Sequence, residues 1–468
     1  MKRAGVRDRN LPAIITLPYL LMVMGFIFSA TAVLHGSDTA EQIEAEIQKV
    51  KDAGEPTSIE ELVPPDIPDE RNGAQVYEEA FSILKELREK HKEEWKYLPY
   101  EGEVKWKDVP ESERKKVVNL LLADPDFVKF YKVIEKASGM ECRFIKREEY
   151  RKGAALPLPH LASLRSCARM LAARAFILTE TGKIDSGLRD CLTGLKISAS
   201  LSLEPILISG LVRIAVDTLI LGQLKETLKK GEPGSRICRT LIEKTGKEMD
   251  NDMLYRALLE ERVIFGMREF PRLMREVEEN KNIEPIKELL EYGGKDKEKK
   301  TESFLKVEDG VRFLEDNELL YLRALADWIA LSRKPYWEAR DRLPEMEENL
   351  KKFPDEEACL VKLLIPAFSR IFIQEARADA QLGNAEIALA CHLYRTKYKV
   401  FPDSLEKLTP QFLKKLSLDP FTGKDYIYRK KDNGFVVYSV GDNLKDDGGV
   451  PQSGEKGKQA DFDIVWEE

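Results

Sequence analysis

Histidines and paired acidic residues are the side chains of this chain whose chemistry could serve catalysis. The 468 residues include four histidines, His35, His91, His160 and His392. None stands in a His-Glu-x-x-His arrangement, and neither a Gly-x-Ser-x-Gly elbow nor a phosphate-binding glycine-rich loop is present. His160 follows Pro-Leu-Pro at the start of a predicted helix, which favours a capping or surface role. His392 falls beside an apolar helical stripe, which favours packing.

The neighbouring acids Glu260-Glu261 and Glu356-Glu357 do not predict a catalytic pair either. Adjacent side chains diverge on a helix, so the two carboxylates of each pair would not converge on one substrate. Carboxylates that are far apart in the sequence can still meet in space, as they do in glycosidases. A hydrolytic site assembled from distant segments therefore stays open as an alternative.

The cysteines are widely spread, with no Cys-x-x-Cys pair and no short metal-ligand spacing. Most of them lie in apolar helical contexts, where a cysteine behaves as a small buried hydrophobe. One or two disulfides are the alternative. The six residues are Cys142, Cys167, Cys191, Cys238, Cys359 and Cys391.

Composition indicates a largely helical globular chain of two or three domains. The hydrophobic content is 43% and the charged content 34%, which argues against global disorder. The formal net charge is -7, and basic residues alternate with acids throughout. Because nucleic-acid binding needs a basic stripe, no nucleic-acid partner is predicted.

Positive charge followed by an apolar run marks residues 1–36 as an export signal or membrane anchor. Basic residues near the start of the chain precede a run from about Leu11 to Leu34. A spanning helix needs about 20 residues and a signal peptide about 7–15, so the run predicts a retained anchor. Ala30-Thr-Ala offers a cleavage site, so a cleaved signal is the alternative. We expect a protein of the cell envelope, single-pass anchored with its bulk outside the cytoplasm, or periplasmic after cleavage.

Residues 37–72 are predicted to be a linker that holds the body away from the membrane, with one short helix at Thr39–Ala53 and several prolines. Apolar side chains then recur at helical spacing through a helical domain, residues 73–355. The charged, glycine-containing stretch near 293–302 is expected to divide this domain into two lobes. Short turns predict antiparallel helices at Leu161–Thr181, Ser186–Leu203 and Pro205–Lys230.

The C-terminal domain, residues 356–468, is predicted to be α+β. A long helix is expected from about Glu357 to Tyr398. Two strand-like segments then flank Asp432-Asn-Gly, which is a strong hairpin signal. The predicted fold class is therefore mainly α, with a membrane or signal helix, a body of antiparallel helices, and a C-terminal long helix on a small antiparallel sheet.

The order of turn signals after the long helix carries a resemblance. A Phe401-Pro402 turn is followed by Asp419-Pro420, the hairpin, Ser439-x-Gly, an acidic glycine-rich loop and Asp463-Ile. This order resembles the globular domain of the major pseudopilins of type II secretion. The resemblance covers about the last ninety residues. The region is also similar to C-terminal modules of long exported proteins of planctomycete-like bacteria.

The resemblance implies calcium binding, because the acidic loop of the secretion family binds this ion. By position, Asn443 stands where that family has the loop aspartate, and Asp463 falls on the aspartate of its terminal Asp-Ile. Asp446, Asp447 and Asp461 are further oxygen donors, and calcium takes six to eight oxygen ligands. Asn443 removes one charge from the family's set, and an acidic surface loop without metal is the alternative.

The N-terminal sequence departs from the pseudopilin pattern. Pseudopilins carry a Gly-Phe peptidase junction just before the membrane helix, with Glu five residues further on. Here Gly25-Phe26 lies inside the apolar run and no Glu follows. The predicted C-terminal helix also carries Arg370, Glu375 and Arg377, which do not suit a spanning segment. Polymerisation into a pseudopilus is therefore not expected.

The sequence favours an exported, membrane-tethered, non-catalytic binding or scaffold protein. Its expected contacts are the membrane, through the N-terminal segment, and a protein partner that the sequence does not identify. The alternative is an exported hydrolase that acts on peptide or glycan, with a site in the helical body.

Overall fold

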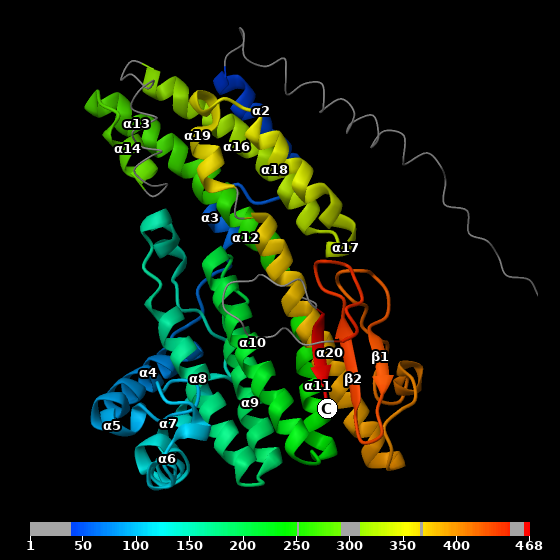
Figure 1. Ribbon diagram of the computed structural model, residues 1–468. Coiled ribbons are helices and arrows are strands. Elements are labelled where there is room, and N and C mark those ends of the chain that lie inside the picture. The colour runs from blue at the N-terminus through cyan, green and yellow to red at the C-terminus, as the bar shows by residue number, and fades with distance from the viewer. Residues whose placement is uncertain (1–38, 250–251, 292–308, 366–367, 450–462) are drawn as a thin grey trace, which may run out of the picture.

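The computed structural model describes residues 39–249, 252–291, 309–365, 368–449 and 463–468. Within them the chain is mainly helical and has a small antiparallel sheet near its C-terminus (Figure 1). The predicted mainly α class with a C-terminal helix and sheet is confirmed at this level. The predicted anchor (1–36) and the dividing stretch (293–302) lie outside the described residues.

A first group of helices and the sheet share one hydrophobic core. Its centre is the antiparallel series α8, α9 and α10, close to the helices predicted from the sequence. Gly182, with φ +77°, ends α8: its amide bonds to the Thr179 carbonyl at 3.0 Å, and the Lys183 amide bonds to the Leu178 carbonyl at 2.8 Å. The helical elements are α4 (Gly73–Lys90), α5 (Lys92–Trp95), η1 (Trp106–Asp108), α6 (Glu111–Ala123), α7 (Pro125–Ala137), η2 (Arg147–Ala155), α8 (Pro159–Glu180), α9 (Ile184–Ala199), α10 (Leu207–Lys230) and α11 (Ser235–Met249).

Among the described residues, α10 is the helix whose length and apolar composition would suffice to cross a membrane. Of the most apolar 18-residue stretch of α10, 56% is buried inside the protein. It packs against α8, α9, α12 (Met253–Glu261) and α20 (Phe368–Tyr398). A helix surrounded by protein on several sides is apolar on several faces, so α10 is the central core helix of the body.

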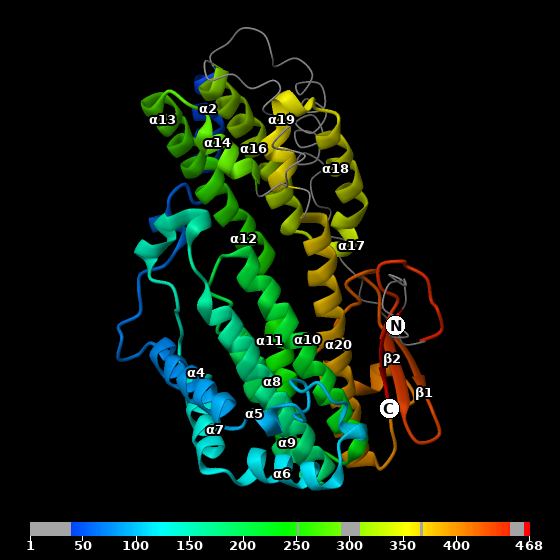
Figure 2. The ribbon, with the colours of Figure 1, turned by 60° about the vertical axis from the view of Figure 1, so that its left-hand side comes forward.

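A second group of helices builds a separate core at the other end of the molecule (Figure 2). The two cores divide near residue 250, where α11 ends and α12 begins. The helical elements are α12 (Met253–Glu261), the π-helical η3 (Arg262–Glu269), α13 (Phe270–Asn280), α14 (Glu284–Glu291), α16 (Gly310–Ser332), α17 (Tyr336–Ala339), η5 (Arg340–Arg342), α18 (Leu343–Lys351) and α19 (Asp355–Leu364).

The stretch predicted as a linker packs on this body. Its helix α2 (Thr39–Asp52) lies along α16, and α3 (Ile59–Leu62) follows. Ile59 and Val63 are 5% and 2% exposed and join an apolar cluster with η2 and η3. Burial of these side chains ties the segment to both groups of helices.

The C-terminal region consists of α20 (Phe368–Tyr398), η6 (Leu405–Leu408) and a sheet of order β1-β2-β3. All neighbouring strands are antiparallel, with Tyr428 opposite Val437 and Val437 opposite Trp466. The hairpin predicted around Asp432-Asn-Gly is confirmed. The one long helix predicted from Glu357 to Tyr398 is described as two helices, α19 and α20, on either side of residues 366–367, which lie outside the described residues. The strands are β1 (Ile427–Lys430), β2 (Phe435–Ser439) and β3 (Ile464–Glu467).

Helix α20 belongs to both cores. Phe368 and Phe372 lie in the second core, whereas Ala385 and Leu389 lie in the first. Residues 382–393 are buried without interruption, because α10 and α11 cover one side and β2 and β3 another. The helix therefore joins the two groups of helices and carries the sheet (Figure 1).

Two helical glycines make a matched test of this packing. A Cβ at Gly383 would lie 2.1 Å from the Tyr426 hydroxyl oxygen, whereas a Cβ at Gly222 in α10 meets nothing within 4 Å. Gly383→Ala is expected to lower the free energy of unfolding by about 1–3 kcal/mol through overpacking. Gly222→Ala is expected to raise it by up to about 1 kcal/mol through helix propensity. Urea unfolding measures both, and a Gly383→Ala protein as stable as the wild type would contradict the close packing of α20 on the sheet.

Candidate functional site

Hydrogen bonds around the acidic loop after β2 (residues 440–449) link three of the predicted calcium ligands, Asn443, Asp447 and Asp463. Asp463 stands at the entry to β3 and is 3% exposed. Its Oδ1 accepts a hydrogen bond from the Asp447 amide at 3.3 Å, and its Oδ2 accepts one from the Gly449 amide at 2.7 Å. The side-chain amide of Asn443 donates to Asp447 Oδ2 at 2.7 Å. Asp461 lies outside the described residues.

Asp446 turns toward the sheet. Its Oδ1 accepts hydrogen bonds from the Tyr438 hydroxyl at 2.7 Å and from the Gly448 amide at 2.9 Å. The Arg429 guanidinium lies 3.4 Å from its other oxygen. Asp446 is therefore held by partners on β1, β2 and the loop itself.

The pKa values of Asp463 and Asp446 are shifted in opposite directions. Burial raises the pKa of Asp463, and the nearby charges of Asp447 and Asp446 add to the shift. The hydrogen bond from Tyr438 and the Gly448 amide lower the pKa of Asp446. Within the described residues, no three carboxylate, histidine or cysteine side chains lie together in a way that could hold a metal ion. In the described part of the loop, backbone amides and the Tyr438 hydroxyl donate hydrogen bonds to the carboxylate oxygens of Asp446 and Asp463.

Sequence reasoning missed the residues that hold this loop on the protein. Arg377 of α20 donates to both oxygens of Asp442, at 2.7 and 2.9 Å from Nη2. Gly449, with φ +71°, lies so close to Tyr438 that a Cβ would stand 2.8 Å from its ring. The loop thus covers the side of the sheet on which Tyr438 lies. Arg377 and Asp442 are 65 positions apart, and no sequence pattern links them.

The buried histidines are paired with glutamates. His160 is 5% exposed, its Nε2 lies 3.2 Å from Glu204 Oε2, and Ser209 donates to the same oxygen at 2.7 Å. The surface or capping role predicted for His160 is therefore wrong, since its ring stacks on Phe144 inside the protein. The packed position predicted for His392 is confirmed. Its Nε2 lies 2.5 Å from the terminal Glu468, in a contact that is also buried.

A second buried charge cluster joins α9, α10 and α11. Arg213 pairs with Glu248, and Lys244 lies 2.5 Å from the other oxygen of Glu248. Ser198 donates to Asp217, whose pKa burial raises to about 7 against the opposing effect of Arg213. The acids and bases of this cluster stabilise one another in a medium that would strongly disfavour any of them alone.

Acids with little exposure also mark the π-helical turn: Glu260 is buried and Glu261 is half-buried. Glu260 and Glu261 end α12, and burial raises the pKa of both, to about 7 for Glu261. The Tyr321 hydroxyl donates to Glu261 at 3.4 Å. Glu318 on α16 is 2% exposed, and burial together with the nearby Glu315 raises its pKa to about 8. Sequence periodicity did not reveal these acids as buried, because their burial depends on the contact between α12 and α16.

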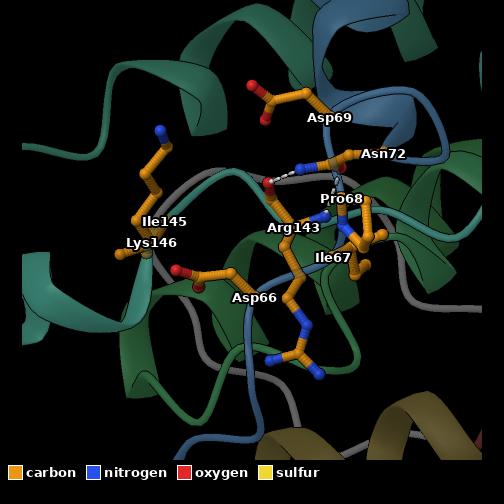
Figure 3. A pocket seen from close by; sticks show the side chains of 8 residues that line it. All are labelled: Asp66, Ile67, Pro68, Asp69, Asn72, Arg143, Ile145 and Lys146. Atoms are coloured by element: carbon orange, nitrogen blue, oxygen red, sulfur yellow. Dashed lines mark hydrogen bonds between the residues drawn. The ribbon is translucent and has the colours of Figure 1, made fainter.

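A small cavity lies on the helical body, between residues 66–72 and 143–146 (Figure 3). It has a volume of about 310 Å³ and is lined by acids and bases that include Asp66, Asp69, Arg143 and Lys146. Asn72 exchanges two hydrogen bonds with the Arg143 backbone, at 2.9 and 3.0 Å, and so fixes one wall. A larger and more open groove of about 530 Å³ runs along α6.

All six cysteines are free and buried. The prediction that they act as small buried hydrophobes is confirmed. Burial raises the pKa of the thiols, for example that of Cys238 to about 12. A buried thiol that stays protonated reacts slowly, so these side chains serve packing.

The fold and the loop define a mainly helical protein with a small sheet whose acidic loop is fastened to α20. Comparisons of the chain with protein-family models, with curated proteins and with solved structures found no match.

Stability is expected to fall as pH rises, because several acids have folded-state pKa values above those of the unfolded chain. Asp217, Glu261 and Glu318 bind protons more tightly in the folded state, with pKa values of about 7, 7 and 8. The stability that they contribute is present below about pH 4 and is lost as pH rises to about 8. Each such group contributes a slope of up to about 1.4 kcal/mol per pH unit.

Glu318→Gln is expected to be more stable than the wild type at pH 8.5 and to lose less stability between pH 6.0 and 8.5. Glu278→Gln, at an exposed position of α13, is the matched control and should follow the wild type. Urea unfolding at the two pH values measures the difference. The same pH dependence in Glu318→Gln and wild type would rule out a buried, ionisable Glu318.

Proposed function

We propose that the chain is an exported, membrane-tethered protein that binds or scaffolds a protein partner without catalysing a reaction. The N-terminal basic residues and the apolar run that ends near Leu34 support export and tethering. The order of turns and strands from Phe401 to Asp463 supports a pseudopilin-like C-terminal module. The net charge of -7 favours a protein partner over nucleic acid.

The observation that carries the proposal is the union of sheet and helical body on α20. The same helix packs on α10 and α11 and supports β2 and β3. The loop is fastened to this helix by Arg377 and Asp442. A module joined in this way presents its strands and acidic loop in a fixed orientation to the body, as a scaffold requires.

The placement of the titratable groups supports a structural role for them. A general acid or base must come within hydrogen-bond reach of its substrate. His160, Glu204 and His392 are 5%, 7% and 3% exposed and are occupied by each other or by neighbouring side chains. The free thiols are buried as well, which protects them from oxidation and is compatible with export.

The hydrolase alternative has one specific place on the body, the cavity that contains Asp66 and Asp69. Asp66 Oδ1 accepts a hydrogen bond from the Arg147 amide at 2.9 Å, which fixes its position. Two carboxylates beside one cavity are the minimum that hydrolysis of a glycosidic bond requires.

Membrane fractionation and turnover assays together test the scaffold and the hydrolase hypotheses. In a bacterial host the full chain is expected to stay with membranes after alkaline carbonate and to be released by detergent. An intact mass that retains residues 1–36 would show a retained anchor. The purified protein is expected to release no product from peptidoglycan or casein. Turnover that disappears in the Asp66→Asn/Asp69→Asn variant would establish the hydrolase and refute the scaffold.

Calcium binding by the acidic loop remains part of the proposal. Burial raises the pKa of Asp463, and the charges of Asp447 and Asp446 add to this shift, so negative charge lies near one buried carboxylate. A divalent cation would neutralise that charge, and aspartate and backbone oxygens are the ligands calcium prefers. The amide hydrogen bonds to Asp463 would have to give way to the ion.

Millimolar calcium is expected to raise the melting temperature of the wild type, because an ion bound only by the folded state stabilises it. Asp463→Asn should abolish the increase. Asp432→Asn, in the exposed hairpin turn, should retain it. Differential scanning fluorimetry with calcium and with EGTA measures the shift. A wild type without a shift, or an Asp463→Asn protein with a normal one, would remove calcium from the proposal.

A further inference from the structure

The helical body has one end at which α2 begins, directly after the predicted membrane segment. We propose that this end lies directly against the lipid headgroups, so that the body rests on the bilayer that the N-terminal segment spans. The inference depends on the proposed anchor and names the surface that the anchored body presents to lipid. It replaces the expectation that residues 37–72 hold the body away from the membrane.

Apolar contacts dock α2 on the helical body. Ile43 is 8% exposed and packs against Leu319 and Leu322 of α16. Ile47 of α2 and Met267 of η3 pack against the same cluster. Removal of the Ile43 side chain from water stabilises the docked arrangement.

Polar contacts fix the direction and register of α2. Arg323 donates to Glu46 at 3.0 Å and to Gln42 at 3.1 Å. The Thr39 hydroxyl lies 3.5 Å from an Asp316 oxygen. Because Thr39 lies beside Asp316 and Glu46 beside Arg323, the two helices run in the same direction. The first residue of α2 is therefore fixed near the N-terminal end of α16.

The chain is fastened again after α2. Arg262 is 2% exposed and donates to Glu55 at 2.7 Å. Truncating one partner of such a buried charge pair costs several kcal/mol, so this contact resists opening. Ile59 and Val63 are buried a few residues further on. Residues 39–63 are thus held at both ends and do not form a free tether.

The length of chain before Thr39 sets the distance to the membrane. The apolar run ends at Leu34, which leaves five Cα-to-Cα steps to Thr39. Fully extended, these steps reach at most about 18 Å. The headgroup layer on one side of a bilayer takes up about 5–8 Å of that distance. A free linker of residues 37–72 could extend more than about 100 Å. Because α2 is docked on the body, the distance between the body and the bilayer is instead limited by the few residues before Thr39.

The elements beside Thr39 identify the face. Gly310, at the start of α16, packs against Val277 of α13 and Ile283 before α14. The start of α2, α13 and α14 lie at one end of the molecule, opposite α6 and the end of α20 (Figures 1 and 2). Lys281 and Arg312 are exposed at the same end, and so are Glu278 and Glu284, so this face carries charges of both signs. The orientation therefore follows from the position of Thr39 and the short length of chain before it.

Collisional quenching in vesicles tests the orientation. The full chain would carry one added cysteine, either Glu279→Cys near the end of α13 or Lys397→Cys near the end of α20, both exposed helical positions. The natural cysteines are buried, so the added one takes the fluorescent label. The probe is a vesicle of phosphatidylcholine and phosphatidylglycerol with a quencher on the lipid headgroup. Quenching is expected to be several-fold stronger at position 279 than at position 397.

Flotation separates this inference from the proposed anchor. Protein that retains the apolar run by intact mass but does not float with vesicles would contradict the anchor itself. Protein that floats with both labels unquenched is held away from the bilayer, and stronger quenching at 397 places the other end on lipid. Either result overturns the inference and leaves the anchor standing.

A second variant is designed to release α2 from the helical body. Ile43→Asp is expected to undock the helix, keep flotation and lower the quenching at position 279, because the chain after the anchor then becomes a free tether. Glu41→Asp, at an exposed position of the same helix, should behave like the wild type. Unchanged quenching in Ile43→Asp would show that docking of α2 does not set the distance.

Discussion

The fold depends on the complete burial of residues 382–393 in α20. A helix that is enclosed on all sides needs neighbours on all sides, and here α10 and α11 supply one side and the sheet another. The strands alone are too short to form a stable sheet without such a support. Gly383 shows how close the approach is, since it leaves room for the Tyr426 hydroxyl. The acidic loop, the C-terminal strand and the second group of helices all take their positions from this helix.

Several charged side chains are buried in and around this enclosure. Polar residues in the enclosed part of α20 reach partners that the neighbouring elements bring to them, as His392 does with Glu468. Arg213 and Glu248 form a comparable pair beneath it, and Asp217 is left with a raised pKa. Buried pairs of this kind contribute less to stability than to a defined arrangement of helices. The buried histidine and the buried acids of this region are thus occupied by partners inside the protein.

Much of the fold could be predicted from the sequence, because helices and hairpins carry local signals. The periodicity of α8 and Gly182 located that helix and its end, and Asp432-Asn-Gly located the hairpin. Local signals do not report tertiary contacts, so the packing of α2 on α16 was missed and its segment was predicted to be a linker. His160 was placed at the surface for the same reason. For the acidic loop, the sequence identified Asn443, Asp446, Asp447 and Asp463 as neighbours, but Arg377, which holds the loop from 65 positions away, carried no signal.

The function proposed here requires that sheet and body move as one unit. Amide hydrogen exchange of the full chain, resolved by mass spectrometry, measures this through the opening free energies of β2, α8 and residues 382–393 of α20. If α20 joins them, the three segments should exchange through one opening of the same free energy. Exchange of β2 through an opening of clearly lower energy, with α8 and α20 still protected, would show a separable C-terminal module and contradict the rigid scaffold.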